Sequence, residues 1–155
     1  MSTEHIPVIP ERRPDHMKTR YVYRAKVDRV YDGDTVFLSF DLGLRVWTMR
    51  VPCRLKGVNA PEVRGENKIA GFDSRDELGR LCVAHSLNRF SDEGFELDDI
   101  PELMVRTMKR RTGEDKPGKY GRWLVDLIGW DWEDGHAVSL NDMLVESGHA
   151  TAYPL

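Results

Sequence analysis

A β-hairpin is predicted by the stretch Val30-Tyr31-Asp32-Gly33-Asp34-Thr35-Val36. Aspartate and glycine are typical of tight turns, because glycine accepts a positive φ and aspartate tolerates one. The chain before the turn, 21–31, is rich in Tyr and Val, and the chain after it, 35–40, has apolar side chains at alternate positions. Such alternation is typical of a strand with one buried face. We therefore expect two antiparallel strands joined at Asp32-Gly33.

The alternation continues over 45–56, after a second turn signal at Asp41-Leu42-Gly43. The period of two places Arg54 on the outward face of this third strand. Pro52 has no N–H to donate to a sheet, so we expect an edge or a bulge there. Five apolar side chains should point inward: Trp47, Met49, Val51, Cys53 and Leu55.

Two helices are predicted from their first turns. Ser74-x-x-Glu77 has the spacing of a capping box and predicts a helix that runs to about Phe90. Ser139-x-x-Asp142 predicts a shorter helix that ends at Gly148.

Two further strands, 103–108 and 122–128, are predicted between these helices. Three strands, a helix, two strands and a helix do not alternate as the elements of a parallel βαβ protein do. The order favours a mainly β, α+β fold, in which a small antiparallel barrel is accompanied by helices.

The bulk properties indicate one globular domain. The chain has 155 residues, of which 40% are hydrophobic and 32% charged, which suffices for one core and hardly for two. We expect a flexible tail over 1–20 and one domain over 21–155. No apolar run approaches the roughly 18 residues that span a bilayer, and the first residues lack a secretory-signal pattern, so we expect a cytoplasmic protein without membrane contact. Cys53 and Cys82 are expected as free thiols.

Charge is segregated along the chain, although the net charge is only −3. The segment 106–122 holds seven Lys and Arg against two acids, and 92–102 holds six acids and no Lys or Arg. One interpretation is a positive field focused on one face, which suits a nucleic acid. The other is a solvated charged hairpin, and the charge pattern alone does not decide between them.

Carboxylates at the first hairpin suit a hard cation. Asp32 and Asp34 stand two apart at a turn, where side chains can converge on an ion such as calcium, although an Asp-Gly-Asp alone is more often only a turn. The loop Asn59-Ala60-Pro61-Glu62 follows the third strand, and Pro61 stiffens it. A stiff loop suits Glu62 to the role of a fixed general base, and a loop glutamate without a partner is the alternative.

Two arginines are candidates for binding phosphate. The guanidinium groups of Arg54 and Arg122 are planar, permanently charged and able to bind a phosphate through paired hydrogen bonds. Tyr120 lies two residues before Arg122 and either stacks on a base or sugar or packs locally as a strand aromatic. The five histidines show no ligand spacing, and we assign none of them to a site: His5, His16, His85, His136 and His149.

The chain resembles the staphylococcal nuclease (thermonuclease) family in three ordered motifs, which are 30–36, 54–62 (RLKGVNAPE) and 119–124 (KYGRWL). The resemblance covers about Tyr21 to Tyr153. It implies an OB-type five-stranded antiparallel barrel with two or three helices, and calcium-dependent hydrolysis of DNA or RNA. Magnesium and manganese are the other candidate ions. The expected partner is single-stranded or unpaired nucleic acid, and we expect a monomer.

The resemblance also implies roles for single residues. Asn59 stands where the family has a second metal-binding aspartate, so one negative charge is missing and we expect weaker calcium binding or a preference for another divalent ion. The implied metal ligands are Asp34, the accessory Asp32 and Asn59. The implied catalytic residues are Glu62, as general base, and the phosphate clamps Arg54 and Arg122. The implied nucleotide-binding residues are Lys119, Tyr120 and Tyr153.

Two other functions stay open at this point. A noncatalytic module that binds single-stranded nucleic acid on the same barrel is favoured by Asn59, and the retained arginines and Glu62 speak against it. A protein-interaction domain would use the basic segment 106–119 to bind an acidic partner. The sequence contains no element that reads bases, so it predicts neither a DNA nor an RNA preference.

Overall fold

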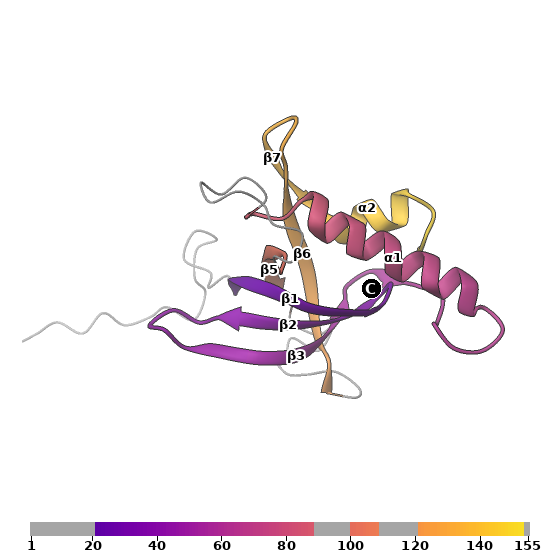
Figure 1. Cartoon of the computed structure of the whole chain (residues 1–155), viewed down its shortest axis with the longest axis horizontal. Coiled ribbons are helices and arrows are strands. Elements are labelled where there is room, and N and C mark those ends of the chain that lie inside the picture. The colour runs from indigo at the N-terminus through magenta and orange to yellow at the C-terminus, as the bar shows by residue number, and fades with distance from the viewer. Residues whose placement is uncertain (1–20, 89–99, 109–120, 154–155) are drawn as a thin grey trace, which may run out of the picture.

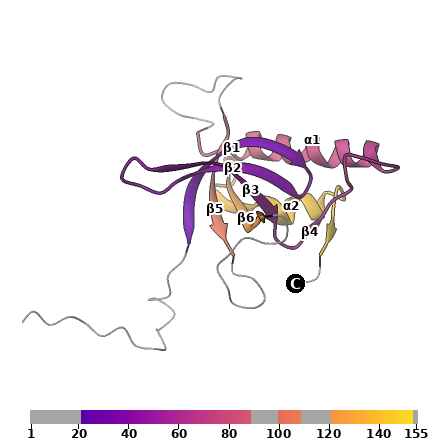
Figure 2. The ribbon, with the colours of Figure 1, turned by 90° about the horizontal axis from the view of Figure 1, so that it is seen from below.

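The computed structural model describes residues 21–88, 100–108 and 121–153. The predicted tail over 1–20 lies outside these residues, as does most of the basic segment. Figures 1 and 2 show the described part as a curved sheet with two helices beside it. In the described residues, no helix combines the length and apolar character needed to cross a membrane.

Five strands close into a barrel. In chain order they are β1 (Val22–Asp32), β2 (Thr35–Asp41), β3 (Trp47–Leu55), β5 (Glu102–Thr107) and β6 (Trp123–Asp131). Neighbours around the barrel follow the order β3-β2-β1-β5-β6, and β6 returns to pair with β3. The predicted α+β, OB-type barrel is confirmed.

One pair in the barrel is parallel, unlike the all-antiparallel arrangement that we expected. Cys53 of β3 lies opposite Trp123 of β6 in a parallel register, whereas the other four barrel pairs are antiparallel. The reason is parity, because five strands in a closed ring cannot all run opposite to both neighbours. The parallel pair places the end of β3 beside the start of β6, and therefore brings Arg54 and Arg122 to the same end of the barrel.

Three short strands and two helices complete the described fold. β7 (His136–Ser139) pairs with β6, and β4 (Val58–Asn59) pairs with β8 (Thr151–Ala152). The helices are α1 (Lys68–Ala84) and α2 (Leu140–Glu146). The start of α2 is as predicted, since Ser139 caps it by accepting a hydrogen bond from the Asp142 N–H.

The predicted start of α1 is wrong. The helix begins at Lys68, six residues before Ser74, and its N-cap residue Asn67 makes no side-chain cap. Ser74 is fully buried inside the helix. The capping-box spacing at Ser74-x-x-Glu77 therefore reflects a small residue at a tight helix contact, which local sequence does not distinguish from a cap.

The core fills the barrel and the space under the helices. Val36, Leu38 and Phe40 of β2 are buried on one face, as the alternation predicts. Leu78 and Leu81 of α1 and Leu140 and Leu144 of α2 join the same cluster. Cys53 and Cys82 also lie in this core as free thiols, and burial raises the pKa of each to about 12.

The first half of β3 does not point into the core, contrary to our prediction. Trp47 is 37% exposed and Met49 70% exposed, whereas Cys53 and Leu55 are buried. The pairing of β3 with β6 is confined to 53–55, so the earlier part of β3 extends past the closed barrel. Alternation predicts that the two faces differ, but whether a face is buried depends on what covers it.

Candidate functional site

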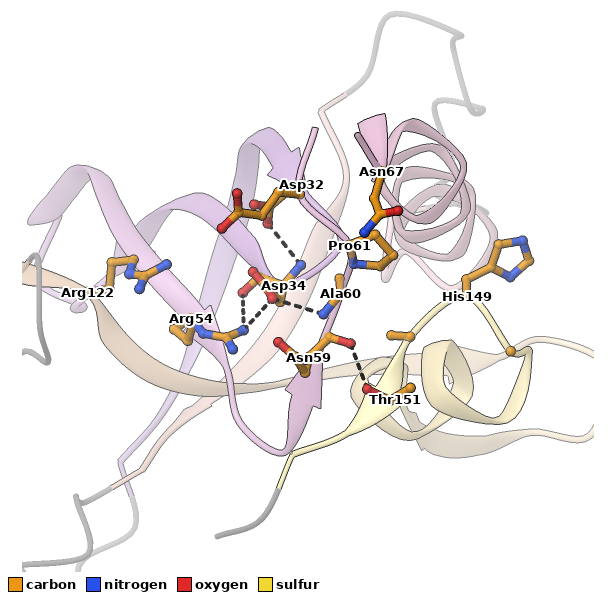
Figure 3. A pocket seen from close by; sticks show the side chains of 13 residues that line it. Asp32, Asp34, Arg54, Asn59, Ala60, Pro61, Asn67, Arg122, His149 and Thr151 are labelled. Carbon is orange, nitrogen blue, oxygen red and sulfur yellow. Dashed lines mark hydrogen bonds and ion pairs between the residues drawn. The ribbon is translucent and has the colours of Figure 1, made fainter. Parts of the chain in front are cut away.

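Six of the predicted site residues line one pocket of about 550 Å³. The pocket lies where the β1–β2 turn, the end of β3, the loop after β4, the start of α1 and the segment before β8 meet (Figure 3). The six are Asp32, Asp34, Arg54, Asn59, Glu62 and Arg122. Residues up to 90 positions apart in sequence are therefore brought to one surface.

A close approach of α1 to the β1–β2 turn builds one wall of the pocket. A side chain at Gly33 would begin 1.9 Å from the Ser74 hydroxyl and 2.7 Å from the Ala60 methyl. Gly33 has no positive φ, so its role differs from the turn conformation that we expected. The glycine is needed because only a residue without a Cβ lets the helix come this close.

The same helix holds the loop that carries Glu62. A Cβ at Gly71 would lie 2.1 Å from the Glu62 carbonyl oxygen, so the helix backbone packs directly on the loop. The ring of Pro61, the residue before Glu62, fixes the φ of Pro61 itself. The Glu62 side chain is exposed and lines the pocket. The backbone of the loop is thus fixed while its carboxylate is open to solvent.

Asp34 is the most buried polar residue of the pocket, with 8% of its surface exposed. Its Oδ2 accepts a hydrogen bond from the Ala60 N–H at 3.0 Å and lies 2.8 Å from Arg54 Nη1. Its Oδ1 accepts a hydrogen bond from the Thr35 hydroxyl at 3.1 Å. The carboxylate is therefore held from three sides, one of them a positive charge.

Arg54 is fixed by the backbone as well as by Asp34. Its Nη1 donates to the Val58 carbonyl at 2.9 Å, and its side chain is 19% exposed. The guanidinium carbon also lies 5.8 Å from the centre of the Tyr153 ring, which is close enough for a cation–π contact. Arg54 was predicted to point outward, and the structure shows a partly buried guanidinium that lines the pocket.

Thr35 connects the second arginine to the same carboxylate. Arg122 Nη1 donates to Thr35 Oγ1 at 3.1 Å, and the Thr35 hydroxyl donates to Asp34 Oδ1. Arg122 and Arg54 therefore both point toward Asp34 (Figure 3). Our sequence reasoning gave Thr35 no role, although its place one residue after Asp34 on a strand that begins there was a signal for it.

Asp32 lies beside Asp34 and is chemically different from it. The pKa of Asp32 is raised to about 6, mainly by burial and further by the neighbouring Asp34 carboxylate. Asp32 Oδ1 also accepts a hydrogen bond from the Asp34 N–H at 3.0 Å, which keeps it in the turn. Two carboxylates this close repel each other, and a bound cation would relieve that repulsion.

The donor set of the pocket fits a hard divalent cation. Carboxylate oxygens of Asp34 and Asp32 and the side-chain amide of Asn59 line the same pocket, and oxygen ligands are those that calcium and magnesium prefer. Asn59 is exposed, and its backbone is fixed because its carbonyl accepts a hydrogen bond from Thr151 Oγ1 at 3.3 Å.

A second group of possible metal ligands lies elsewhere. Ligand atoms of Asp131, Asp134 and His136, at the β6–β7 turn, lie within 4.8 Å of one another. The Asp131 carboxylate already accepts two hydrogen bonds from the turn, from the N–H groups of Glu133 and Asp134. These hydrogen bonds account for the position of Asp131 without a metal, and the group lies outside the predicted pocket.

Sequence reasoning missed several residues that line the pocket. Two other residues that it predicted fall outside the part of the chain that the structure describes. His149 lines the pocket, although we assigned no histidine to a site; its Nδ1 lies 2.9 Å from the Ser147 hydroxyl. Asn67 and Thr151 line it too. The predicted nucleotide-binding residues Lys119 and Tyr120 lie outside the residues that the structure describes.

No protein-family model matches this chain, and no curated protein matches it in sequence. The resemblance of its three motifs to the staphylococcal nuclease family therefore stays an expectation. A function has to be inferred from the chemistry of the pocket, in which two arginines, two aspartates and a glutamate meet.

Proposed function

We propose that this protein is a divalent-metal-dependent endonuclease, which hydrolyses phosphodiester bonds of DNA or RNA. The observation that supports it best is the convergence of Arg54 and Arg122 on a pocket lined by Asp34, Asp32 and Glu62. Metal-dependent phosphodiester hydrolysis uses positive groups for the phosphate together with oxygen donors for the cation. The three motifs that resemble the staphylococcal nuclease family support the same proposal.

The two arginines bind and orient the phosphate. Each guanidinium offers paired N–H donors to phosphate oxygens. Both are held in advance, Arg54 by the Val58 carbonyl and Arg122 by the Thr35 hydroxyl. Because the charge on the phosphate oxygens redistributes in the transition state, fixed cations next to them lower the barrier.

Glu62 takes the proton of the attacking water. Its carboxylate is at the solvent side of the pocket, where a water can reach it, and its backbone is held by Pro61 and by the packing of Gly71. A general base must stay within hydrogen-bond reach of the water that it deprotonates, and a fixed loop meets that need.

Asp34, Asp32 and Asn59 are the residues that would hold the cation, with calcium as the first candidate and magnesium or manganese as the others. A cation bound there supplies electrostatic stabilisation of the phosphate oxygens. Tyr153, whose ring lies 5.8 Å from the Arg54 guanidinium carbon, is proposed to contact the nucleotide, and Lys119 and Tyr120 are proposed to do so on the grounds of the motif alone.

The proposal is tested by cleavage of denatured DNA and of RNA with calcium, magnesium or manganese, against a chelator. The Glu62→Gln variant keeps the shape of the side chain and removes the base, so cleavage should fall by at least about a hundredfold. Glu66→Gln is the matched control, because Glu66 is also exposed, four residues later, and does not line the pocket. Equal activity of Glu62→Gln and the wild type would contradict the proposal.

A second candidate function is a noncatalytic module that binds single-stranded nucleic acid. Two observations favour it: Asn59 supplies no negative charge, and Asp34 is paired with Arg54. This module would bind nucleic acid in the presence of a chelator and cleave nothing with any of the three ions. The same experiment therefore separates the two functions.

A further inference from the structure

The hairpin between β2 and β3 extends away from the barrel, and residues 42–50 form what we call the β2–β3 arm. Both views place the tip of the arm at the opposite end of β2 from the Asp32–Thr35 turn (Figures 1 and 2). Five of the twelve large hydrophobic side chains that are exposed in the described residues lie in this arm, which concentrates them far from the pocket. They are Leu42, Leu44, Val46, Trp47 and Met49.

Most of the arm is open to solvent in the described part of the chain. Leu44 at its tip is 97% exposed, and Met49 is 70% exposed. Among the described residues, β3 pairs with β6 only over 53–55, so they supply no neighbouring strand for this edge of β3 at 47–52. Exposed apolar side chains that gather in one short segment are typical of a place where a partner binds.

The backbone of the arm is also unusual. Leu44, Arg45 and Arg50 have φ values of 53°, 63° and 51°, and in the described residues they are the only non-glycine residues with positive φ. Non-glycine residues in this region are strained, and such residues gather at functional sites. The arm is therefore an independent candidate for a binding element.

Charge decides which partner fits. Residues 42–50 contain Arg45 and Arg50, both exposed, and no acidic residue. Lys26 of β1 adds a third positive charge over the Trp47 ring at 5.0 Å. The nearest acidic residue in sequence, Asp41, lies at the base of the arm, where its Oδ1 accepts a hydrogen bond from the Gly43 N–H. A second copy of the arm would be repelled by this positive surface, whereas a polyanion would be attracted.

We propose that the β2–β3 arm is a second nucleic-acid contact, which binds a double-helical stretch of the substrate. Arg45 and Arg50 would bind backbone phosphates, and Leu44 would enter a groove as an apolar wedge, since apolar side chains beside arginines act in this way on DNA. The choice of nucleic acid as the partner rests on the proposed function. The position and chemistry of the arm are independent of the proposed function.

The length of β2 gives the spacing of the two contacts. The ten residues from Asp34 to the tip at Leu44 span roughly 30 Å at the rise of an extended strand. Duplex DNA rises about 3.4 Å per base pair, so the arm would contact the duplex about nine base pairs from the pocket. A duplex shorter than this span cannot reach both places.

The test is binding in a chelator, where cleavage is absent, to labelled hairpin duplexes of about 24 and about 6 base pairs, which are longer and shorter than this span. The arm variant carries Leu44→Asn, Arg45→Asn and Arg50→Asn, because asparagine is among the non-glycine residues that best tolerate positive φ. The control variant carries Arg75→Asn and Arg80→Asn, two arginines on the outer side of α1. Thermal melting of each variant checks that it is folded.

The arm variant should bind the long duplex at least about tenfold more weakly, and the slope of log K against log salt should fall by about 2, one for each phosphate that the arm no longer binds. Binding of the short duplex should be unchanged, and the control variant should bind both as the wild type does. Equally weakened binding of both duplexes, or unchanged binding of the long one, would overturn the proposal.

Other partners would give different results. Arm-dependent binding to phosphatidylserine vesicles with unchanged duplex binding would replace nucleic acid by a membrane, and arm-dependent self-association would replace it by a second copy. Arm-dependent duplex binding without cleavage by any ion would leave the arm proposal standing and remove the nuclease. Metal-dependent cleavage, together with duplex binding that the arm variant does not weaken, would leave the nuclease proposal standing and remove the arm proposal.

Discussion

Arg54 Nη1 lies 2.8 Å from Asp34 Oδ2, so the arginine proposed to bind phosphate is paired with the carboxylate proposed to bind metal. The same nitrogen also donates to the Val58 carbonyl, and Asp34 accepts hydrogen bonds from Ala60 and Thr35. The two groups are thus held in contact before any ligand arrives. Binding of a cation to Asp34 competes with this pair, and binding of a phosphate to Arg54 does so too.

Replacing Arg54 should therefore separate metal binding from cleavage. In Arg54→Ala the Asp34 carboxylate loses its positive partner, so calcium should bind about fivefold more tightly, which corresponds to about 1 kcal/mol for a partly exposed ion pair. Cleavage should fall by at least about a hundredfold because a phosphate clamp is removed. Calorimetric calcium titration and cleavage rates check both effects. Arg122→Ala is the control, since Arg122 is connected to Asp34 through the Thr35 hydroxyl. Calcium binding weaker in Arg54→Ala than in the wild type would contradict the prediction.

Restoring the missing charge at Asn59 should strengthen metal binding. Ligand charge tunes calcium affinity over orders of magnitude, so Asn59→Asp should lower the calcium concentration that gives half-maximal cleavage by about tenfold. Asn67→Asp adds the same charge to the same pocket from the start of α1 and should change that concentration far less. If the two variants shift it equally, Asn59 acts through general charge and not as a ligand.

The raised pKa of Asp32 predicts a pH-dependent gain in stability for Asp32→Asn in a chelator. The folded-state pKa of about 6 lies above the ordinary 3.8, so the charged carboxylate destabilises the fold fully above pH 6 and not below pH 3.8. The variant should raise the free energy of unfolding at pH 7.5 by about 1 kcal/mol, discounted because the carboxylate is partly exposed, and by almost nothing near pH 4.

Urea unfolding at both pH values measures this difference. Asp73→Asn, on the exposed side of α1, controls for the removal of one negative charge. A gain for Asp32→Asn that is the same at both pH values would show that ionisation of Asp32 is not its cause.

The contact between α1 and the β1–β2 turn predicts opposite effects for two glycines. Gly33→Ala places a Cβ 1.9 Å from the Ser74 hydroxyl and 2.7 Å from Ala60, so it should lower the free energy of unfolding by about 1–3 kcal/mol. Gly79→Ala, inside α1 with no atom within 4 Å of the new Cβ, should raise it by up to about 1 kcal/mol. Urea unfolding of both variants is the measurement, and a Gly33→Ala variant as stable as the wild type would show that the helix can move away from the turn without cost.

Much of the fold could be predicted from the sequence because the signals are local. The turn between β1 and β2, the alternation in β2 and the Ser139 cap of α2 each depend on residues within a few positions of one another. Those relations exist before the chain folds. The start of α1 was missed because Ser74 has the spacing of a cap and lies instead at a contact with Gly33, a residue far away in sequence.

The sequence by itself determined the two arginines, the two aspartates and the glutamate of the candidate site and the segments that carry them. Only the tertiary structure decided that Arg54 pairs with Asp34, that Thr35 connects Arg122 to the same carboxylate, and that Trp47 and Met49 stay exposed. The physical reason is that local patterns fix the direction of a side chain relative to its own strand. Its partner and its burial depend on what the closed barrel and α1 bring to that position.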